Sequence, residues 1–100
     1  MRRGAMNRFT VRIELRGSEP MDYEPLHAAM KKAGFKRTIT KSGQILKLPR
    51  GEYILSREGL AIGDVMKKAC GAADHVSDDY GVLVTGPGQF KSHGLESAES

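Results

Sequence analysis

Three side chains in this sequence can exchange protons with a bound substrate, and all three lie close along the chain to a dense group of cations. They are His27, Glu52 and Tyr53. RNA cleavage without a metal uses the 2′-hydroxyl of the substrate as nucleophile, so the protein supplies only a base, an acid and cationic groups. We take these three residues as candidate catalytic residues for that reaction. The alternatives are structural: His27 on a helix surface, and Tyr53 packed within a strand.

The cations form a run along the chain. Residues 31–50 contain seven Lys or Arg residues and no acidic residue. Because phosphate groups are bound mainly by such side chains, we predict that RNA phosphates contact the members of the run after residue 34. These are Lys36, Arg37, Lys41, Lys47 and Arg50. The two earlier members have a second explanation, since cations stabilise the C-terminal end of a helix.

Charge is divided unevenly between the two halves of the sequence. Residues 1–50 have a net charge of +8 and residues 51–100 a net charge of −4, which gives +4 overall. Such asymmetry favours binding of a polyanion, and it also suits association of the basic part of one subunit with the acidic part of another. Two hypotheses follow from it: a protein that binds single-stranded RNA, and a non-enzymatic homodimeric interaction module of prophage origin.

Residues that could hold a metal ion are too scattered to form a site. His27, His75 and His93 lack the spacing of zinc ligands, and the sequence offers no cysteine pair to join them. The carboxylates between residues 14 and 24 are divided between a strand and the start of a helix. Cys70, the only cysteine, lies among alanines, and we expect its thiol to be buried and to serve in packing. We therefore expect no metal and no small-molecule cofactor.

The periodicity of apolar residues defines the elements that position these side chains. The predicted elements are a strand at 8–16, a helix at 22–34, strands at 35–41 and 44–56, a helix at 60–74 and a strand at 80–85. Gly34 is typical of a residue that ends a helix, and Ser42-Gly43 of a hairpin turn. Pro49 lies within the third predicted strand, where we expect a bulge or kink.

This order, β-α-β-β-α-β, predicts a ferredoxin-like α+β fold. A four-stranded antiparallel sheet would carry both helices on one face, with the first and third strands in its centre. The domain would span residues 8–86. Residues 1–7 are expected to be flexible, and residues 87–100 to form a tail in which Phe90 and Leu95 attach a short edge strand before the chain becomes disordered.

The sequence contains no segment expected to enter a membrane. The basic N-terminus is not followed by the apolar region of a signal peptide, and no apolar stretch approaches the length of a transmembrane helix. We predict a cytoplasmic protein without membrane contact.

Several segments resemble a family of small bacterial proteins that looks related to the endoribonuclease antitoxin of type V toxin–antitoxin systems. They are FTVRIEL (9–15), DY (22–23), LHAAM (26–30), GFKRTI (34–39), LPRGEY (48–53), VLVT (82–85) and HGL (93–95). The resemblance implies a ferredoxin-like fold similar to that of CRISPR-associated nucleases, and metal-independent cleavage of messenger RNA. It assigns no catalytic residue. Where the CRISPR-associated nucleases carry an acidic metal ligand, after the first strand, this sequence reads Arg16-Gly17.

Overall fold

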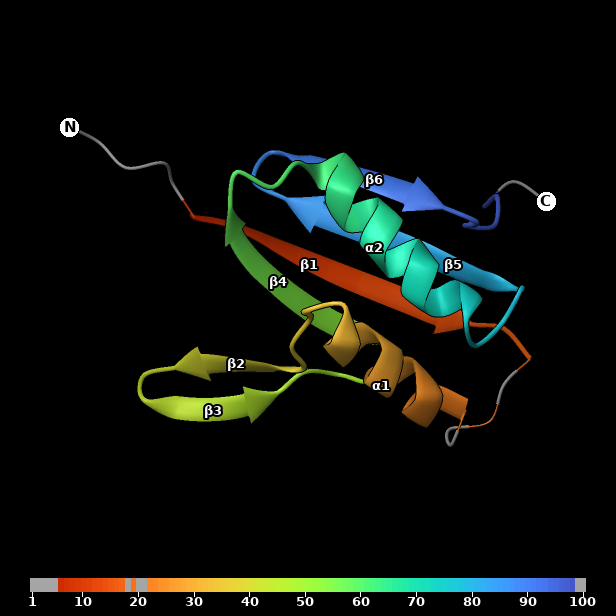
Figure 1. Ribbon diagram of the computed structural model, residues 1–100, viewed down its shortest axis with the longest axis horizontal. Helices are drawn as coiled ribbons and strands as arrows, with labels where there is room; N and C mark the ends of the chain where they lie inside the picture. Colours follow the sequence, from red (N-terminus) through yellow and green to blue (C-terminus); the bar gives the residue numbers. More distant parts are fainter. Residues whose placement is uncertain (1–5, 18, 20–21, 99–100) are drawn as a thin grey trace.

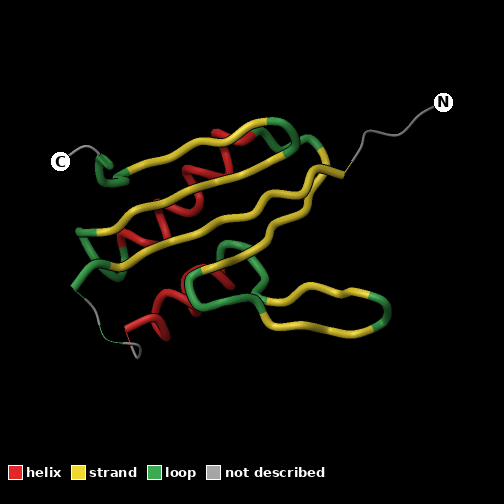
Figure 2. Tube along the Cα trace, turned by 180° about the vertical axis from the view of Figure 1, so that it is seen from behind, coloured by secondary structure: helices red, strands yellow, loops and turns green. Residues whose placement is uncertain are grey.

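The computed structural model describes residues 6–17, 19 and 22–98. Its elements, in chain order, are β1 (Met6–Leu15), α1 (Tyr23–Lys32), β2 (Thr38–Lys41), β3 (Gln44–Lys47), β4 (Glu52–Glu58), α2 (Ile62–Asp74), β5 (Tyr80–Gly86) and β6 (Gln89–His93). Figure 1 shows both helices in front of the large sheet, and Figure 2 shows the uncovered face behind it. The predicted α+β class with a four-stranded antiparallel sheet is confirmed, but the order of elements is βαβββαββ.

The sheet has the strand order β4-β1-β5-β6, and all its pairs are antiparallel. Its centre is formed by β1 and β5, whereas the sequence predicted the first and third strands there. The second predicted strand, 35–41, contributes only one isolated bridge, between Lys36 and Ile54, and its remaining paired residues form a separate two-stranded sheet with β3. The β2–β3 hairpin is therefore an appendage beside the sheet (Figure 1).

The predicted strand 44–56 is wrong, because the chain turns back in its middle. The backbone N–H of Glu52 donates to the carbonyl of Pro49 (3.0 Å), and Gly51 has φ +86°. Only glycine adopts that conformation at low cost. The apolar residues on both sides of Pro49 thus belong to two strands in different sheets, β3 and β4, rather than to one kinked strand.

The hairpin closes through Ser42 and Gly43, as predicted. Both residues have positive φ, 50° and 80°, and Lys41 pairs with Gln44 across the turn. Two successive positive φ values define the type I′ turn, whose twist matches that of the strands it joins. The hairpin thus closes through its own turn, and its two strands form a sheet of their own.

The core lies between the helices and the sheet face that they cover. Alternation along β1 directs Phe9, Val11, Ile13 and Leu15 into it, as the sequence predicted. Leu26 and Met30 of α1 and Val65 and Ala69 of α2 supply the helical side. Among the described residues, Tyr53 has the largest fully buried side chain, and it fixes the start of β4 in the core.

The structure shows how α1 ends and which element follows β5. Gly34 ends α1 with φ +101°, and the N–H groups of Gly34 and Phe35 bond to the carbonyls of Lys31 and Met30. In the predicted tail, β6 is a five-residue strand paired with β5.

Beyond β6, the Arg16 side chain fixes the chain by donating to the carbonyl of Gly94 and pairing with Asp79 (3.0 Å).

Of the segment predicted to be flexible, residues 1–5 lie outside the described part of the chain, while residues 6 and 7 belong to β1. Residues 99–100 of the predicted disordered end lie outside it too.

Candidate functional site

A hydrogen bond joins two of the three candidate catalytic residues. His27, on α1, and Tyr53, at the start of β4, are 26 residues apart in the chain, and His27 Nδ1 lies 2.7 Å from the Tyr53 hydroxyl. Their ring centroids are 5.8 Å apart. The bond fixes the imidazole ring and leaves Nε2 as the nitrogen that can meet a ligand. Because a hydroxyl can both donate and accept, Tyr53 can serve either neutral tautomer of His27.

Burial keeps this pair uncharged, and neighbouring cations add to its effect on His27. The pKa of His27 is lowered from its usual 6.5, first by burial and then by the Arg37 and Arg50 guanidinium groups, while Glu24 acts in the opposite direction. Burial raises the pKa of the Tyr53 hydroxyl, which therefore stays protonated. At neutral pH the site thus holds a neutral imidazole, the form that can accept a proton.

A cleft of about 580 Å³ lies beside the pair, and we call it the α1 cleft. Its lining comes from α1 and from the segment leading into β2: Glu24, His27, Ala28, Lys31, Phe35, Lys36, Arg37 and Thr38. Three of these residues are cations and one is a carboxylate. The Nε atom of Arg37 is buried and has no hydrogen-bond partner within the described part of the chain.

Tyr23 is a member of the site that the sequence prediction missed. Its ring lies 6.4 Å from that of His27, and the Arg50 guanidinium lies over it, 5.3 Å from the centroid. The Tyr23 hydroxyl accepts the backbone N–H of Leu15 (3.0 Å), which ties α1 to β1. A signal existed, because residues four apart on a helix share a face, and Tyr23 is four residues before His27. No comparable signal links His27 to Tyr53.

The remaining predicted residues are more dispersed. Glu52 is opposite Arg12 on the sheet face turned away from the helices, so the structure does not bring it to His27. Lys36 and Arg37 line the α1 cleft. Lys41 and Lys47 lie on opposite faces of the hairpin, because Lys41 shares a face with Ile39, and Lys47 pairs with Thr38 on the other.

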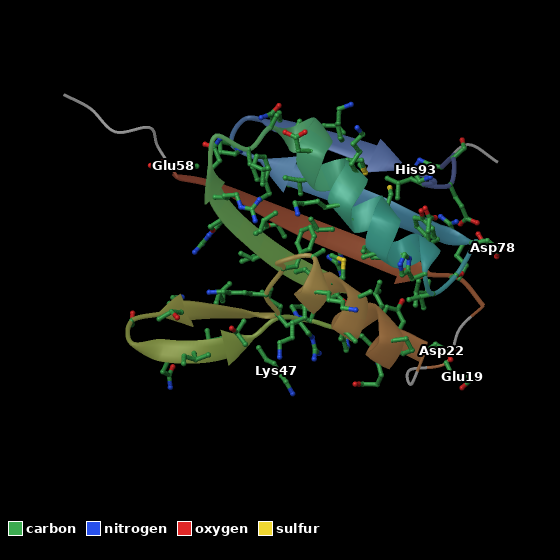
Figure 3. All side chains as sticks on the ribbon, in the orientation of Figure 1. Glu19, Asp22, Lys47, Glu58, Asp78 and His93 are labelled. Atoms are coloured by element: carbon green, nitrogen blue, oxygen red, sulfur yellow. The ribbon has the colours of Figure 1, made fainter. Side chains whose placement is uncertain are left out.

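Figure 3 shows Lys47 where β3 reaches the body of the protein, close to α1 in this view. Lys41 is adjacent to the distal turn of the hairpin. Of the five predicted cationic residues, Lys36 and Arg37 therefore line the cleft together with His27, and Arg37 and Arg50 lower the pKa of His27. Lys47 lies at the hairpin base and Lys41 at its tip.

The remaining reactive groups do not form a site. Among the described residues, no group of three or more His, Cys, Asp or Glu side chains could hold a metal ion. Cys70 is half-buried on α2, its thiol contacts the sulfur of Met66, and burial raises its pKa. A thiol in that state is a packing group rather than a nucleophile. No helix of the described chain is both long enough and apolar enough to cross a membrane.

The lowered pKa of His27 has a consequence for stability. In the unfolded chain His27 takes up a proton near pH 6.5, whereas in the folded protein it resists protonation until lower pH. The unfolded state therefore binds more protons in that window, and the free energy of unfolding falls as the pH drops from 6.5 toward the folded pKa. We expect His27→Gln to remove this part of the slope, as measured by urea unfolding at about pH 7.5 and about pH 5.5.

The matched control for this measurement is His75→Gln, since His75 is exposed at the end of α2. That variant is expected to keep the slope that His27 causes. Equal slopes for the wild type and His27→Gln would contradict the assignment of a buried, neutral imidazole.

No protein-family model matches the chain, and no curated protein or solved structure matches it significantly. The structure itself shows a small α+β domain with an antiparallel sheet.

Proposed function

We propose that this protein binds single-stranded RNA in the α1 cleft. The observation that carries the proposal is the set of three cations, Lys31, Lys36 and Arg37, that lines the cleft beside His27. Cationic side chains bind phosphate oxygens through charge-assisted hydrogen bonds. An anion placed there would also lie beside the neutral imidazole of His27.

The surroundings of the cleft favour a polyanion over a small anion. Arg50 lies over Tyr23 next to His27, and Lys47 lies at the hairpin base, so cations continue on both sides of the cleft. A volume of about 580 Å³ is within the range of sites for single ligands and fits a nucleotide rather than a duplex. Single strands can place one nucleotide at a time in such a site.

The first test is the salt dependence of binding. We expect Arg37→Gln to weaken the affinity for an unstructured oligoribonucleotide by about tenfold or more, because it removes one of the three cations that line the cleft. The slope of log K against log salt should become shallower by about one unit, as one phosphate contact is lost. Fluorescence anisotropy at several salt concentrations measures both quantities.

Lys67→Gln on the exposed face of α2 is the matched control, because it removes one positive charge away from the cleft. It should change the affinity little. Affinity that does not depend on salt, or equal losses in the two variants, would contradict the proposal. Absence of RNA binding together with a dimer that dissociates in salt would instead support a non-enzymatic homodimeric module, in which the exposed Ile45 and Phe90 provide apolar contacts.

A second function, metal-independent cleavage of the bound RNA, is favoured by the His27–Tyr53 hydrogen bond. In this scheme Nε2 of neutral His27 takes the proton of the 2′-hydroxyl, and the 2′-oxygen attacks the phosphorus as the bond to the 5′-oxygen breaks. The 5′-oxygen takes a proton from water, so the products are a 2′,3′-cyclic phosphate and a 5′-hydroxyl. The hydroxyl of Tyr53 accepts the Nδ1–H of the resulting imidazolium and holds it in place. Arg37 stabilises the charge that develops on the phosphate. The resemblance of several segments to the type V antitoxin family also favours this second function.

A further inference from the structure

A second groove, which we call the β4 groove, lies between the outer edge of β4 and β2. Its volume is about 250 Å³. The polar side chains that line it are two cations, Arg8 and Lys36, and three hydroxyl groups, Thr38, Thr40 and Ser56. The lining contains no carboxylate. Such a set of donors suits a phosphate group, and the volume is below that of sites for whole drug-sized ligands.

The backbone of β4 adds a donor to this groove. Ile54 uses its N–H and its carbonyl to bond with Lys36, at 2.8 Å each, on the side away from β1. Backbone groups alternate along a strand, so the N–H of Ser56, two residues later, points to the same side. At Ser56, β4 is the edge of the sheet. The residue that would continue the pairing of Lys36 with Ile54 is Gly34, and Gly34 still belongs to the turn that ends α1.

The two hollows meet at the base of the hairpin. Lys36 and Thr38 line both the β4 groove and the α1 cleft. One extended ligand can therefore occupy both by passing over this segment. In RNA the phosphates recur at every nucleotide, so the same chain offers an anion to each hollow.

We propose that the β4 groove is a second phosphate-binding subsite, in which Arg8, Lys36 and the N–H of Ser56 hold a phosphodiester of the strand whose neighbouring nucleotide lies in the α1 cleft. This inference rests on the proposed RNA-binding function. It predicts a dependence on ligand length, since an oligonucleotide that fills only the α1 cleft cannot reach Arg8.

The test compares Arg8→Gln with wild type on a mononucleotide, uridine 5′-monophosphate, which can fill only the α1 cleft, and on an oligouridylate of about twelve nucleotides, a length within known single-strand site sizes. We expect about a tenfold loss of affinity for the oligouridylate and no change for the mononucleotide. Lys91→Gln, on β6 at the other edge of the sheet, is the matched control and should affect neither. Equal effects of Arg8→Gln and Lys91→Gln on the oligouridylate, or equal losses for both ligands, would overturn the subsite.

A titration with inorganic phosphate separates failure of the subsite from failure of the proposed function. We expect the backbone amide signals of Ser56 and Lys36 to shift together in ¹⁵N-correlated NMR spectra, and the shift to be reduced in Arg8→Gln. Phosphate-dependent shifts without RNA binding would support an anion subsite and overturn the RNA function. RNA binding with unmoved Ser56 and Lys36 signals would overturn the subsite and leave the RNA function standing.

Discussion

His27→Gln is expected to lower the rate of the proposed cleavage of single-stranded RNA by about 10²–10⁴-fold, the contribution of a positioned proton-transfer group. The neutral imidazole 2.7 Å from the Tyr53 hydroxyl is the only group of the candidate site whose pKa is shifted toward a base that is active at neutral pH. Single-turnover cleavage of a labelled oligonucleotide in excess chelator measures the rate without a contribution from metal ions.

Three comparisons sharpen that measurement. Tyr53→Phe keeps the buried ring and removes only the partner of Nδ1, so we expect a smaller loss, about tenfold, from poorer orientation of the imidazole. The exposed His75→Gln should cleave like the wild type. The rate should rise with pH through a pKa below 6.5, because the deprotonated form of His27 is the active one. A rate unchanged in His27→Gln would exclude this residue as the base and would leave RNA binding as the function.

Gly51→Ala is expected to have a large effect on stability, a loss of about 3–4 kcal/mol in the free energy of unfolding. A Cβ atom at residue 51 would lie 2.5 Å from the carbonyl oxygen of Ile13, and the backbone there has φ +86°. The neighbouring N–H of Ile13 donates to the carbonyl of Gly51 (2.7 Å), so a shift that relieves the contact weakens a hydrogen bond to the central strand. Urea unfolding measures the change.

Gly43→Ala is the matched control for this substitution. Gly43 has nearly the same backbone conformation, φ +80°, but a Cβ atom there would meet nothing within 4 Å. It should cost only about 1–2 kcal/mol, the price of the left-handed conformation. The difference between the two variants isolates the contact with Ile13. Equal losses would mean that the connection between the hairpin and β4 can move away from β1.

Local patterns were enough to predict most of the elements. Alternation along β1, the helix end at Gly34 and the turn at Ser42-Gly43 each depend on a few adjacent residues, and the structure contains them all. The error in the strand containing Pro49 has a different origin. Apolar residues flank residues 49–51 on both sides, which favoured one continuous strand. The turn is seen in the structure, where Glu52 bonds back to Pro49 and Gly51 closely approaches β1.

The candidate site shows the same limit. His27 and Tyr53 were each identified by residue type, but their hydrogen bond depends on how α1 packs over β4, which no local pattern encodes. Glu52 and Tyr53 were both predicted as proton-transfer groups, but adjacent strand residues point to opposite faces, so only Tyr53 meets His27. Tyr23 could have been found from helical spacing alone.

The separation of the hairpin from the main sheet affects how this protein can change in evolution. No side chain of residues 38–47 is buried, and the hairpin closes through its own turn. Mutations there are thus largely free of the folding constraints that act on the core, and the length, charge and sequence of the arm can vary without loss of the scaffold. The His27–Tyr53 pair belongs to the constrained part. Selection can therefore alter the length and charge of the arm while the His27–Tyr53 pair stays the same.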